Sequence, residues 1–177
     1  MATRKRKLIL GVLAVLLLVF LYRVFFVYTV RSGECRPRPD HGKLARFPPP
    51  RRPLVVMTYN IAGHDELLDG DHVRHIGEAI RRLHPDVVAL QEVHRNTWQA
   101  RFRDQLAELE KRTGLRGSFA PSYVRWGGAY GNAILTRGQI VKAEVHSLPC
   151  VGEPRTLLEA TIRIEGATIT FYTTHLT

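Results

Sequence analysis

The hydrophobic pattern changes along the chain, and its first feature is an apolar run from Leu8 to Val30 that only Arg23 interrupts. As an α-helix, these 23 residues would span roughly 35 Å, which is enough to cross a bilayer. Arg23 lies about two helical turns from the end of the run, where its long stem can reach the headgroups. The pattern therefore predicts one transmembrane helix.

A cleaved signal peptide is the alternative interpretation of this run. The apolar core Leu8–Tyr22 fits that class, but cleavage also requires small residues, and no alanine occurs between Ala14 and Ala45. We therefore favour an uncleaved anchor over residues 1–30. The basic cluster Arg4–Lys7 predicts a cytoplasmic N-terminus and places the rest of this single-pass protein on the extracytoplasmic side.

A proline-rich segment follows the apolar run. Residues 31–53 contain six of the ten prolines of the chain. Such a segment cannot bury a core and favours extended conformations, so it is typical of a stiff tether. A folded domain is predicted over residues 54–177.

The first part of this domain has the pattern of alternating strands and helices. Leu54–Ile61 and Asp86–Gln91 are apolar runs typical of buried strands. Residues 71–83 between them form one apolar helix face with Val73, Ile76, Ile80 and Leu83. A second helix ending at Gly114 is indicated by the same spacing at Trp98, Phe102, Leu106 and Leu109.

Short strands dominate the pattern after Gly117. We place turns at Arg137-Gly138 and Glu165-Gly166, and strands at Ala133–Thr136, Ile140–Val145, Leu157–Ile164 and Thr168–Thr174. Strand–helix–strand–helix followed by hairpins predicts an α+β fold in which helices cover a sheet.

The net charge differs between the N-terminal segment and the predicted domain. Residues 1–53 hold 12 Lys/Arg and 2 Asp/Glu, whereas residues 54–177 hold 14 of each sign, so the net charge of +10 lies outside the domain. Strong sequence-independent binding to DNA requires a basic face on the domain itself. The composition therefore disfavours a protein that binds DNA strongly and without sequence preference, although it leaves room for a local basic groove.

Two polar side chains stand where the predicted buried strands end. Asn60 ends the first strand and Glu92 follows the second. If these strands are neighbours, both side chains point into one cleft, and their oxygen atoms would suit Mg²⁺. A polar residue at a strand end is as often only a turn cap.

Three further residues are candidates for contact with a phosphate. His175 ends a strand, Arg155 opens one and could hold a phosphate bidentately, and Asn132 precedes an apolar strand. Each has an ordinary structural alternative, since a histidine at a strand end is more often a hydrogen-bonding partner than a catalyst.

Five segments follow one another in a fixed order: Thr58–Ile61, Pro85–Glu92, Tyr130–Leu135, the strand opened by Arg155, and Thr173–Leu176. This ordered set resembles the endonuclease/exonuclease/phosphatase superfamily, which has the deoxyribonuclease I-like fold, a four-layer α/β/β/α sandwich. The resemblance covers residues 54–177. It implies hydrolysis of a phosphoester by an activated water, with Mg²⁺, or alternatively Mn²⁺, as cofactor.

The resemblance also implies roles for single residues. Glu92 would be the main metal-binding carboxylate, and Asn60 would lie near the metal and the attacking water. His175 would contact the scissile phosphate, while Arg155 and Asn132 would lie near the substrate.

Superfamily members continue beyond the histidine-containing strand with an Asp-x-Asn segment and a final Asp-His pair, and neither follows His175. We therefore expect the first half of the sandwich, preceded by one transmembrane helix, in a truncated chain that is inactive by itself. The function indicated is a membrane-tethered, metal-dependent phosphoester hydrolase of the phosphodiesterase, nuclease or phosphatase type. Its substrate would be a nucleic acid or a phospholipid-type phosphoester, and no protein partner is implied. The alternative is a non-catalytic binding module that keeps the fold without the chemistry.

Overall fold

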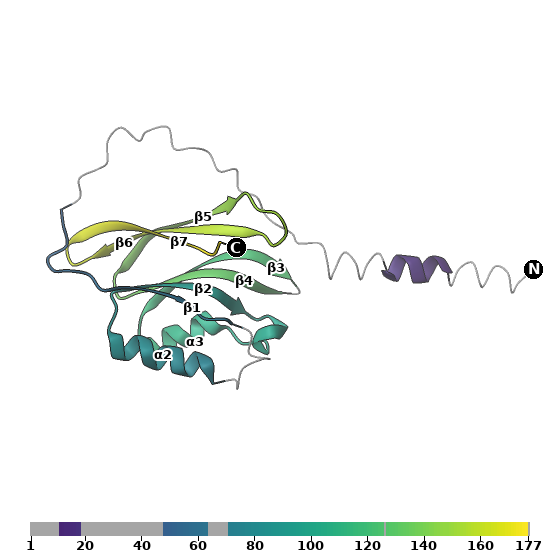
Figure 1. The fold of residues 1–177 in the computed structure, drawn as a ribbon, viewed down its shortest axis with the longest axis horizontal. Coiled ribbons are helices and arrows are strands. Elements are labelled where there is room, and N and C mark those ends of the chain that lie inside the picture. The colour runs from purple at the N-terminus through teal and green to yellow at the C-terminus, as the bar shows by residue number, and fades with distance from the viewer. Residues whose placement is uncertain (1–10, 19–47, 64–70, 126, 177) are drawn as a thin grey trace, which may run out of the picture.

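The computed structural model describes residues 11–18, 48–63, 71–125 and 127–176. Two β-sheets lie face to face, and two helices cover the outer face of the first sheet (Figure 1). The fold is therefore α+β, as the sequence predicts. The described part consists of three layers, in the order helices, first sheet, second sheet.

The first sheet has the strand order β1-β2-β4-β3, and only β1 and β2 are parallel. Its strands are β1 Val56–Asn60, β2 Val87–Arg95, β3 Arg116–Arg125 and β4 Gly128–Thr136. The second sheet is antiparallel, with the order β5-β6-β7. Its strands are β5 Gln139–Leu148, β6 Arg155–Ile164 and β7 Ala167–Thr174. The strand predictions after residue 128 are confirmed within a few residues, and so are both predicted turns.

The helices are α2, His72–Leu83, and α3, Gln105–Thr113. Both direct apolar side chains at the first sheet, and the resulting core includes Val73, Ile76, Ile80, Leu106 and Leu109. A second core lies between the sheets, where Leu158, Ala160 and Ile162 of β6 meet Ile134 of β4. Full burial of a side chain of this size stabilises a fold by about 1.5–3 kcal/mol.

The predicted helix through Trp98 and Phe102 is wrong in its first half. Trp98 lies in a 3₁₀ turn, Trp98–Ala100, and α3 begins only after Asp104, whose side chain accepts a hydrogen bond from the N–H of Ala107. Arg101 and Phe102 between them have positive φ, which no helix permits. Trp98 and Phe102 are accordingly 50% and 69% exposed. The end of the helix at Gly114 is confirmed, with Gly114 at φ 73°.

Two other differences arise at the edges of the first sheet. β1 is an edge strand with Val56 and Tyr59 exposed, rather than the buried strand that its composition indicates. β3, at the opposite edge, has no counterpart among the predicted strands. It contains Pro121, which is compatible with an edge strand and lies here beside a bulge. Leu83, predicted on the buried face of α2, is exposed at its last turn.

Of the predicted anchor Leu8–Val30, only residues 11–18 are described, and they are helical. Among the described residues, no helix is both long and apolar enough to span a membrane. The remainder of the predicted span and residues 31–47 of the predicted tether lie outside the described residues.

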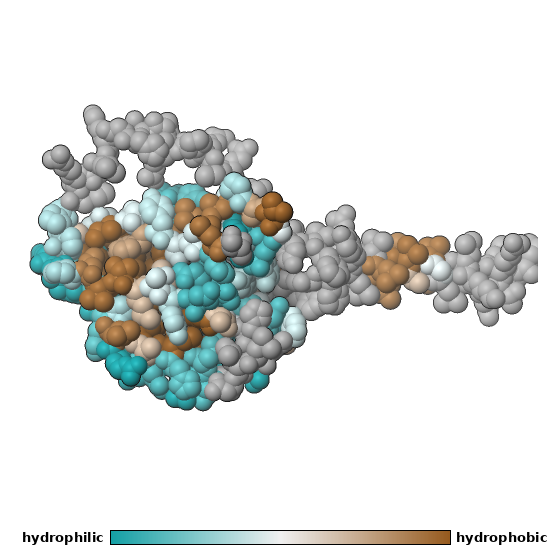
Figure 2. Space-filling model, in the orientation of Figure 1, coloured by the Kyte–Doolittle hydropathy of each residue, from teal (hydrophilic) through white to brown (hydrophobic). Residues whose placement is uncertain are grey.

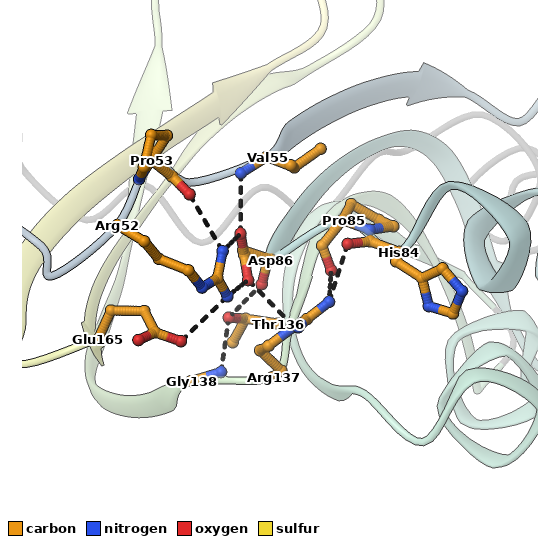
Figure 3. Close-up of polar contacts among 10 residues, drawn as sticks. All are labelled: Arg52, Pro53, Val55, His84, Pro85, Asp86, Thr136, Arg137, Gly138 and Glu165. Carbon is orange, nitrogen blue, oxygen red and sulfur yellow. Dashed lines mark hydrogen bonds and ion pairs between the residues drawn. The ribbon is translucent and has the colours of Figure 1, made fainter.

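A buried carboxylate fastens the chain before β1 to the base of the sandwich (Figure 3). Asp86, just before β2, accepts hydrogen bonds from both terminal nitrogens of Arg52, at 2.9 and 2.7 Å, and from the N–H of Val55, at 2.8 Å. Arg137 lies 3.1 Å from the same carboxylate, and Arg52 also pairs with Glu165 at 3.0 Å. The hydrogen bonds from Arg52 are the main cause that lowers the pKa of Asp86 to about 2. We call Arg52, Asp86, Arg137 and Glu165 the Asp86 clamp.

Apolar side chains are also found on the surface. Figure 2 shows sizeable apolar areas on the visible face of the sandwich, and the exposed large apolar side chains of the domain include Val55, Val56, Val145 and Tyr172. Among the described residues, no helix or strand covers the outer face of the second sheet (Figure 1).

Candidate active site

Three of the five predicted site residues, Asn60, Glu92 and His175, meet at one end of the sandwich. β1 and β2 are parallel neighbours, with Asn60 paired to Gln91, so their carboxyl ends meet at one edge. Glu92 follows directly in β2, and His175 follows the last residue of β7 in the second sheet. Residues from both sheets that are far apart in sequence thus meet at this site.

Glu92 owes its position to an irregularity in β2. The pairing of β2 with β4 shifts register between Leu90 and Val93, and Glu92 has φ 60°. Successive side chains of a regular strand point to opposite faces, whereas a bulge can direct two of them to one side. Gln91 and Glu92 accordingly both contact residues of β1 and of the segment at β7. A non-glycine residue in the left-handed region is uncommon and costs roughly 1 kcal/mol or more.

The carboxylate of Glu92 has two different environments. One oxygen, Oε1, accepts a hydrogen bond of 2.8 Å from Nδ2 of Asn60 and lies 3.8 Å from Nε2 of His175. The other oxygen receives no hydrogen bond from the described residues. Glu92 and His175 are both partly exposed, so a ligand can reach them from solvent.

Asn60 uses both ends of its side-chain amide within the protein. Its Oδ1 accepts from the N–H of Ala62 at 2.9 Å, and its Nδ2 donates to Glu92. In this arrangement Asn60 orients Glu92, and its own oxygen is not available as a second ligand for a metal. Direct coordination of a metal by Asn60 stays a prediction, and it would require Oδ1 to leave Ala62.

Gln91 and Gln105 support the site from two sides. The amide of Gln91 donates to the hydroxyl of Thr173 in β7, at 3.0 Å, and so joins the two sheets beside Glu92. Gln105 is fully buried, donates to the carbonyl of Gly63 at 2.8 Å and accepts from the N–H of His94 at 2.9 Å. The segment after β1 is thereby held against β2 next to Glu92.

Gly63 permits the close approach of this segment. Its N–H donates to the carbonyl of Glu92 at 3.2 Å. A Cβ atom at this position would lie 2.2 Å from the same carbonyl oxygen and 2.6 Å from Oε1 of Gln105. Any larger residue would therefore displace the backbone of Glu92.

Arg155 and Asn132 lie deeper between the sheets. Arg155 donates to Glu153 at 2.8 Å, and its side chain is 8% exposed. Asn132 is buried and donates to the carbonyl of Thr156 at 2.9 Å. Asn132 thus helps to hold β4 to β6, whereas the buried guanidinium of Arg155 pairs with Glu153.

Tyr130 of β4 links these residues to Glu92. Its ring stacks on that of Tyr123 with 5.0 Å between centroids. Burial, the main cause, together with the charges of Glu153 and Glu92, raises the pKa of Tyr130, while the charge of Arg155 acts in the opposite direction. Tyr130 is therefore neutral at physiological pH.

Two buried polar atoms of the site lack hydrogen-bond partners among the described residues: Nδ1 of His175 and Nε of Arg155. Buried polar atoms usually have partners, because leaving one unpaired costs about 1–3 kcal/mol. Unpaired donors beside a partly free carboxylate fit a site that binds a further group. The donor set at Glu92, oxygen atoms open to solvent, also fits a Mg²⁺ ion that keeps most of its waters.

Sequence reasoning identified neither Gln105, Gly63 nor Tyr130 as site residues. Tyr130 and Gly63 carry a weak signal, since each stands beside a predicted site segment. Nothing in the pattern distinguishes Gln105 from an ordinary polar residue at the start of a helix.

Comparison with known proteins identifies the family. The sequence model described as the endonuclease/exonuclease/phosphatase family matches residues 57–173, which is well over half of the chain. The chain belongs to this family. A comparison with curated proteins found no match.

Solved structures of the family agree with the fold. A protein from Beutenbergia cavernae gives a TM-score of 0.54 at 26% identity, covering 70% of this chain and 38% of that one. D. rerio TDP2 with a single-strand DNA product gives 0.55 at 24% identity, covering 70% and 46%. ANGEL2, a 2′,3′-cyclic phosphatase, gives 0.50 at 21%, covering 70% and 41%. The last two show likeness of fold alone, and the chain spans less than half the length of each structure.

Proposed function

We propose that the protein is a phosphoester hydrolase whose divalent metal, Mg²⁺ or alternatively Mn²⁺, is held at Glu92. The observation that carries this proposal is the meeting of Glu92 and His175, which come from different sheets and lie 3.8 Å apart at the end of the sandwich. Membership of the endonuclease/exonuclease/phosphatase family supports the same reaction class.

Each side chain has a task in this proposal. Asn60 positions Glu92 through its 2.8 Å hydrogen bond, which leaves the other carboxylate oxygen to hold a metal when one is bound. The metal, when bound, offsets negative charge on the phosphoryl oxygens. His175 donates a hydrogen bond to a phosphate oxygen, and the buried guanidinium of Arg155 adds positive charge to the phosphate side of the site. Water attacks phosphorus, and the bond from phosphorus to the leaving oxygen breaks.

Two substrate classes, a nucleic acid and a phospholipid-type phosphoester, can be compared directly. TDP2, which shares the fold, has been determined with a single-strand DNA product, and this makes a nucleic acid one candidate substrate. A membrane anchor at Leu8–Val30, which we propose from the apolar run and the basic cluster before it, supports a phospholipid-type phosphoester instead. On this proposal the N-terminus is cytoplasmic and the domain lies on the extracytoplasmic side. The nucleic acid is the first substrate to test, because it has support from a structural neighbour.

The test is made on the full-length protein and compares the wild type with Glu92→Gln and His175→Ala. Hydrolysis of a chromogenic phosphodiester, single-stranded DNA and phospholipid vesicles is followed as a function of Mg²⁺, and Mn²⁺ binding is measured separately by electron paramagnetic resonance. Glu92→Gln is expected to weaken Mn²⁺ binding and to lower turnover by several orders of magnitude, because a neutral amide is a poor ligand for a hard cation. His175→Ala is expected to lower turnover similarly with unchanged Mn²⁺ binding.

Glu78→Gln is the matched control. Glu78 is an exposed carboxylate of α2 that pairs with Arg74 at 2.9 Å, remote from the site, so its change should leave both measurements within a few-fold of wild type. The proposal fails if Glu92→Gln retains normal Mn²⁺ affinity and normal turnover.

A further inference from the structure

A second cluster of metal-ligating side chains lies on the second sheet. Glu144 and His146 are two residues apart on β5, and Glu159 of β6 is the direct cross-strand partner of Glu144. Alternate residues of a strand share a face, so all three side chains stand on one face of the sheet. That face is the outer one, since Leu158 and Ala160, on either side of Glu159, belong to the core between the sheets.

The three side chains are close enough to share one ion. One ligand atom from each lies within 4.8 Å of the other two, and Nε2 of His146 is 2.9 Å from Oε2 of Glu159. Ligands about 2 Å from a tetrahedral ion lie roughly 3.3 Å apart, so small side-chain rotations would complete the geometry. Glu159 is only 8% exposed, although it stands on the outer face.

The local charges favour a cation at this place. Two carboxylates that face each other across neighbouring strands repel, and burial of Glu159 strengthens that repulsion. The amino group of Lys142 lies 2.8 Å from Oε1 of Glu144 and offsets part of the charge. A divalent ion between Glu144, His146 and Glu159 would counter the repulsion between the two carboxylates and join β5 to β6.

The ligand set selects the kind of ion. One imidazole with two carboxylates is a set that suits Zn²⁺ and similar transition metals, with a fourth position open to water. Mg²⁺ prefers oxygen ligands alone, which is the chemistry at Glu92. We propose that Glu144, His146 and Glu159 form a Zn²⁺-binding site, chemically different from the Mg²⁺ site of the proposed function and independent of it.

The test uses the full chain in detergent, freed of metals by a chelator and then kept in a large excess of Mg²⁺. Zn²⁺ is titrated by calorimetry, and Co²⁺ by its visible absorption, which reports tetrahedral coordination. We expect His146→Gln and Glu159→Gln each to weaken Zn²⁺ binding at this site by at least about tenfold, since each removes one of three ligands. His84→Gln, a change at an exposed histidine after α2, should leave binding unaltered.

Lys142→Met provides a test in the opposite direction. Removing the amino group takes away one competitor for the carboxylate of Glu144. Zn²⁺ should therefore bind several-fold more tightly, and it should raise the melting temperature further than in the wild type. This variant keeps the ligands intact and remains informative if a ligand variant fails to fold. Unchanged Zn²⁺ affinity in His146→Gln and Glu159→Gln, or no gain in Lys142→Met, would overturn the proposal.

Discussion

Replacing Asp86 by asparagine tests whether the Asp86 clamp stabilises the domain. The carboxylate is fully buried and accepts two hydrogen bonds from Arg52 and one from the N–H of Val55, with Arg137 3.1 Å away. Asparagine has almost the same size but carries no charge, so the variant removes the ionic part of these contacts and little of the packing.

The magnitude follows from the pKa of Asp86. Its fall from 3.8 to about 2 corresponds to about 2.5 kcal/mol of folding free energy. Because the folded-state pKa lies below the unfolded-state pKa, this stabilisation is fully present above about pH 4 and is lost as the pH falls through about 2. Asp86→Asn should therefore lower the free energy of unfolding by about 2–3 kcal/mol at pH 7, and by much less near pH 2.

The measurement is urea denaturation followed by far-ultraviolet circular dichroism at several pH values between 2 and 7. Glu78→Gln serves as the control, because an exposed ion pair contributes only about 0–1 kcal/mol. If Asp86→Asn were as stable as the wild type at pH 7, or if the two curves ran parallel down to pH 2, the clamp would not have the stabilising role assigned to it.

Three further predictions concern the backbone at the site and the start of the chain. Because Glu92 has φ 60°, Glu92→Gly should be about 1 kcal/mol more stable than Glu92→Ala to urea, whereas equal stabilities would mean that the bulge relaxes. Gly63→Ala should weaken Mn²⁺ binding without touching a ligand, since its Cβ would meet the carbonyl of Glu92 at 2.2 Å; normal binding would contradict the close approach. An alkaline phosphatase fused after residue 53 should be active outside the cytoplasm and the mature protein should retain its N-terminus, whereas a new N-terminus near Gly33 would refute the proposed anchor.

The parts of the fold that depend on local sequence patterns could be predicted from the sequence. The turns at Arg137-Gly138 and Glu165-Gly166 separate apolar runs, and each run became a strand. The closeness of Asn60 and Glu92 could also be inferred, because parallel neighbouring strands bring their carboxyl ends to one edge. These predictions needed only periodicity, turn residues and one topological assumption.

Features that depend on distant contacts could not be predicted in this way. The apolar composition of β1 indicates a buried strand. The pairing of the strands places β1 at the edge of the first sheet, however, and Val56 is exposed there. The spacing of Trp98 and Phe102 fits a helix, yet Asp104 caps a later start and changes the direction of the chain. The positive φ of Glu92 and the bridging role of Gln105 arise from the pairing of β2 with β4 and from the packing of α3.

The Asp86 clamp also has a consequence for the reach of the protein. It holds the chain at Arg52, before β1 (Figure 3). Glu92 lies at the other end of that strand, because its neighbour Gln91 pairs with Asn60, the last residue of β1. Five strand residues separate the two ends by about 17 Å. The part of the proposed tether before the clamp, residues 31–51, would span roughly 65 Å in the polyproline conformation that its prolines favour. If the chain is anchored as proposed, a pulling force on the tether would act on the Asp86 clamp. The site at Glu92 and His175 would then face away from the membrane, toward substrates that arrive from solution.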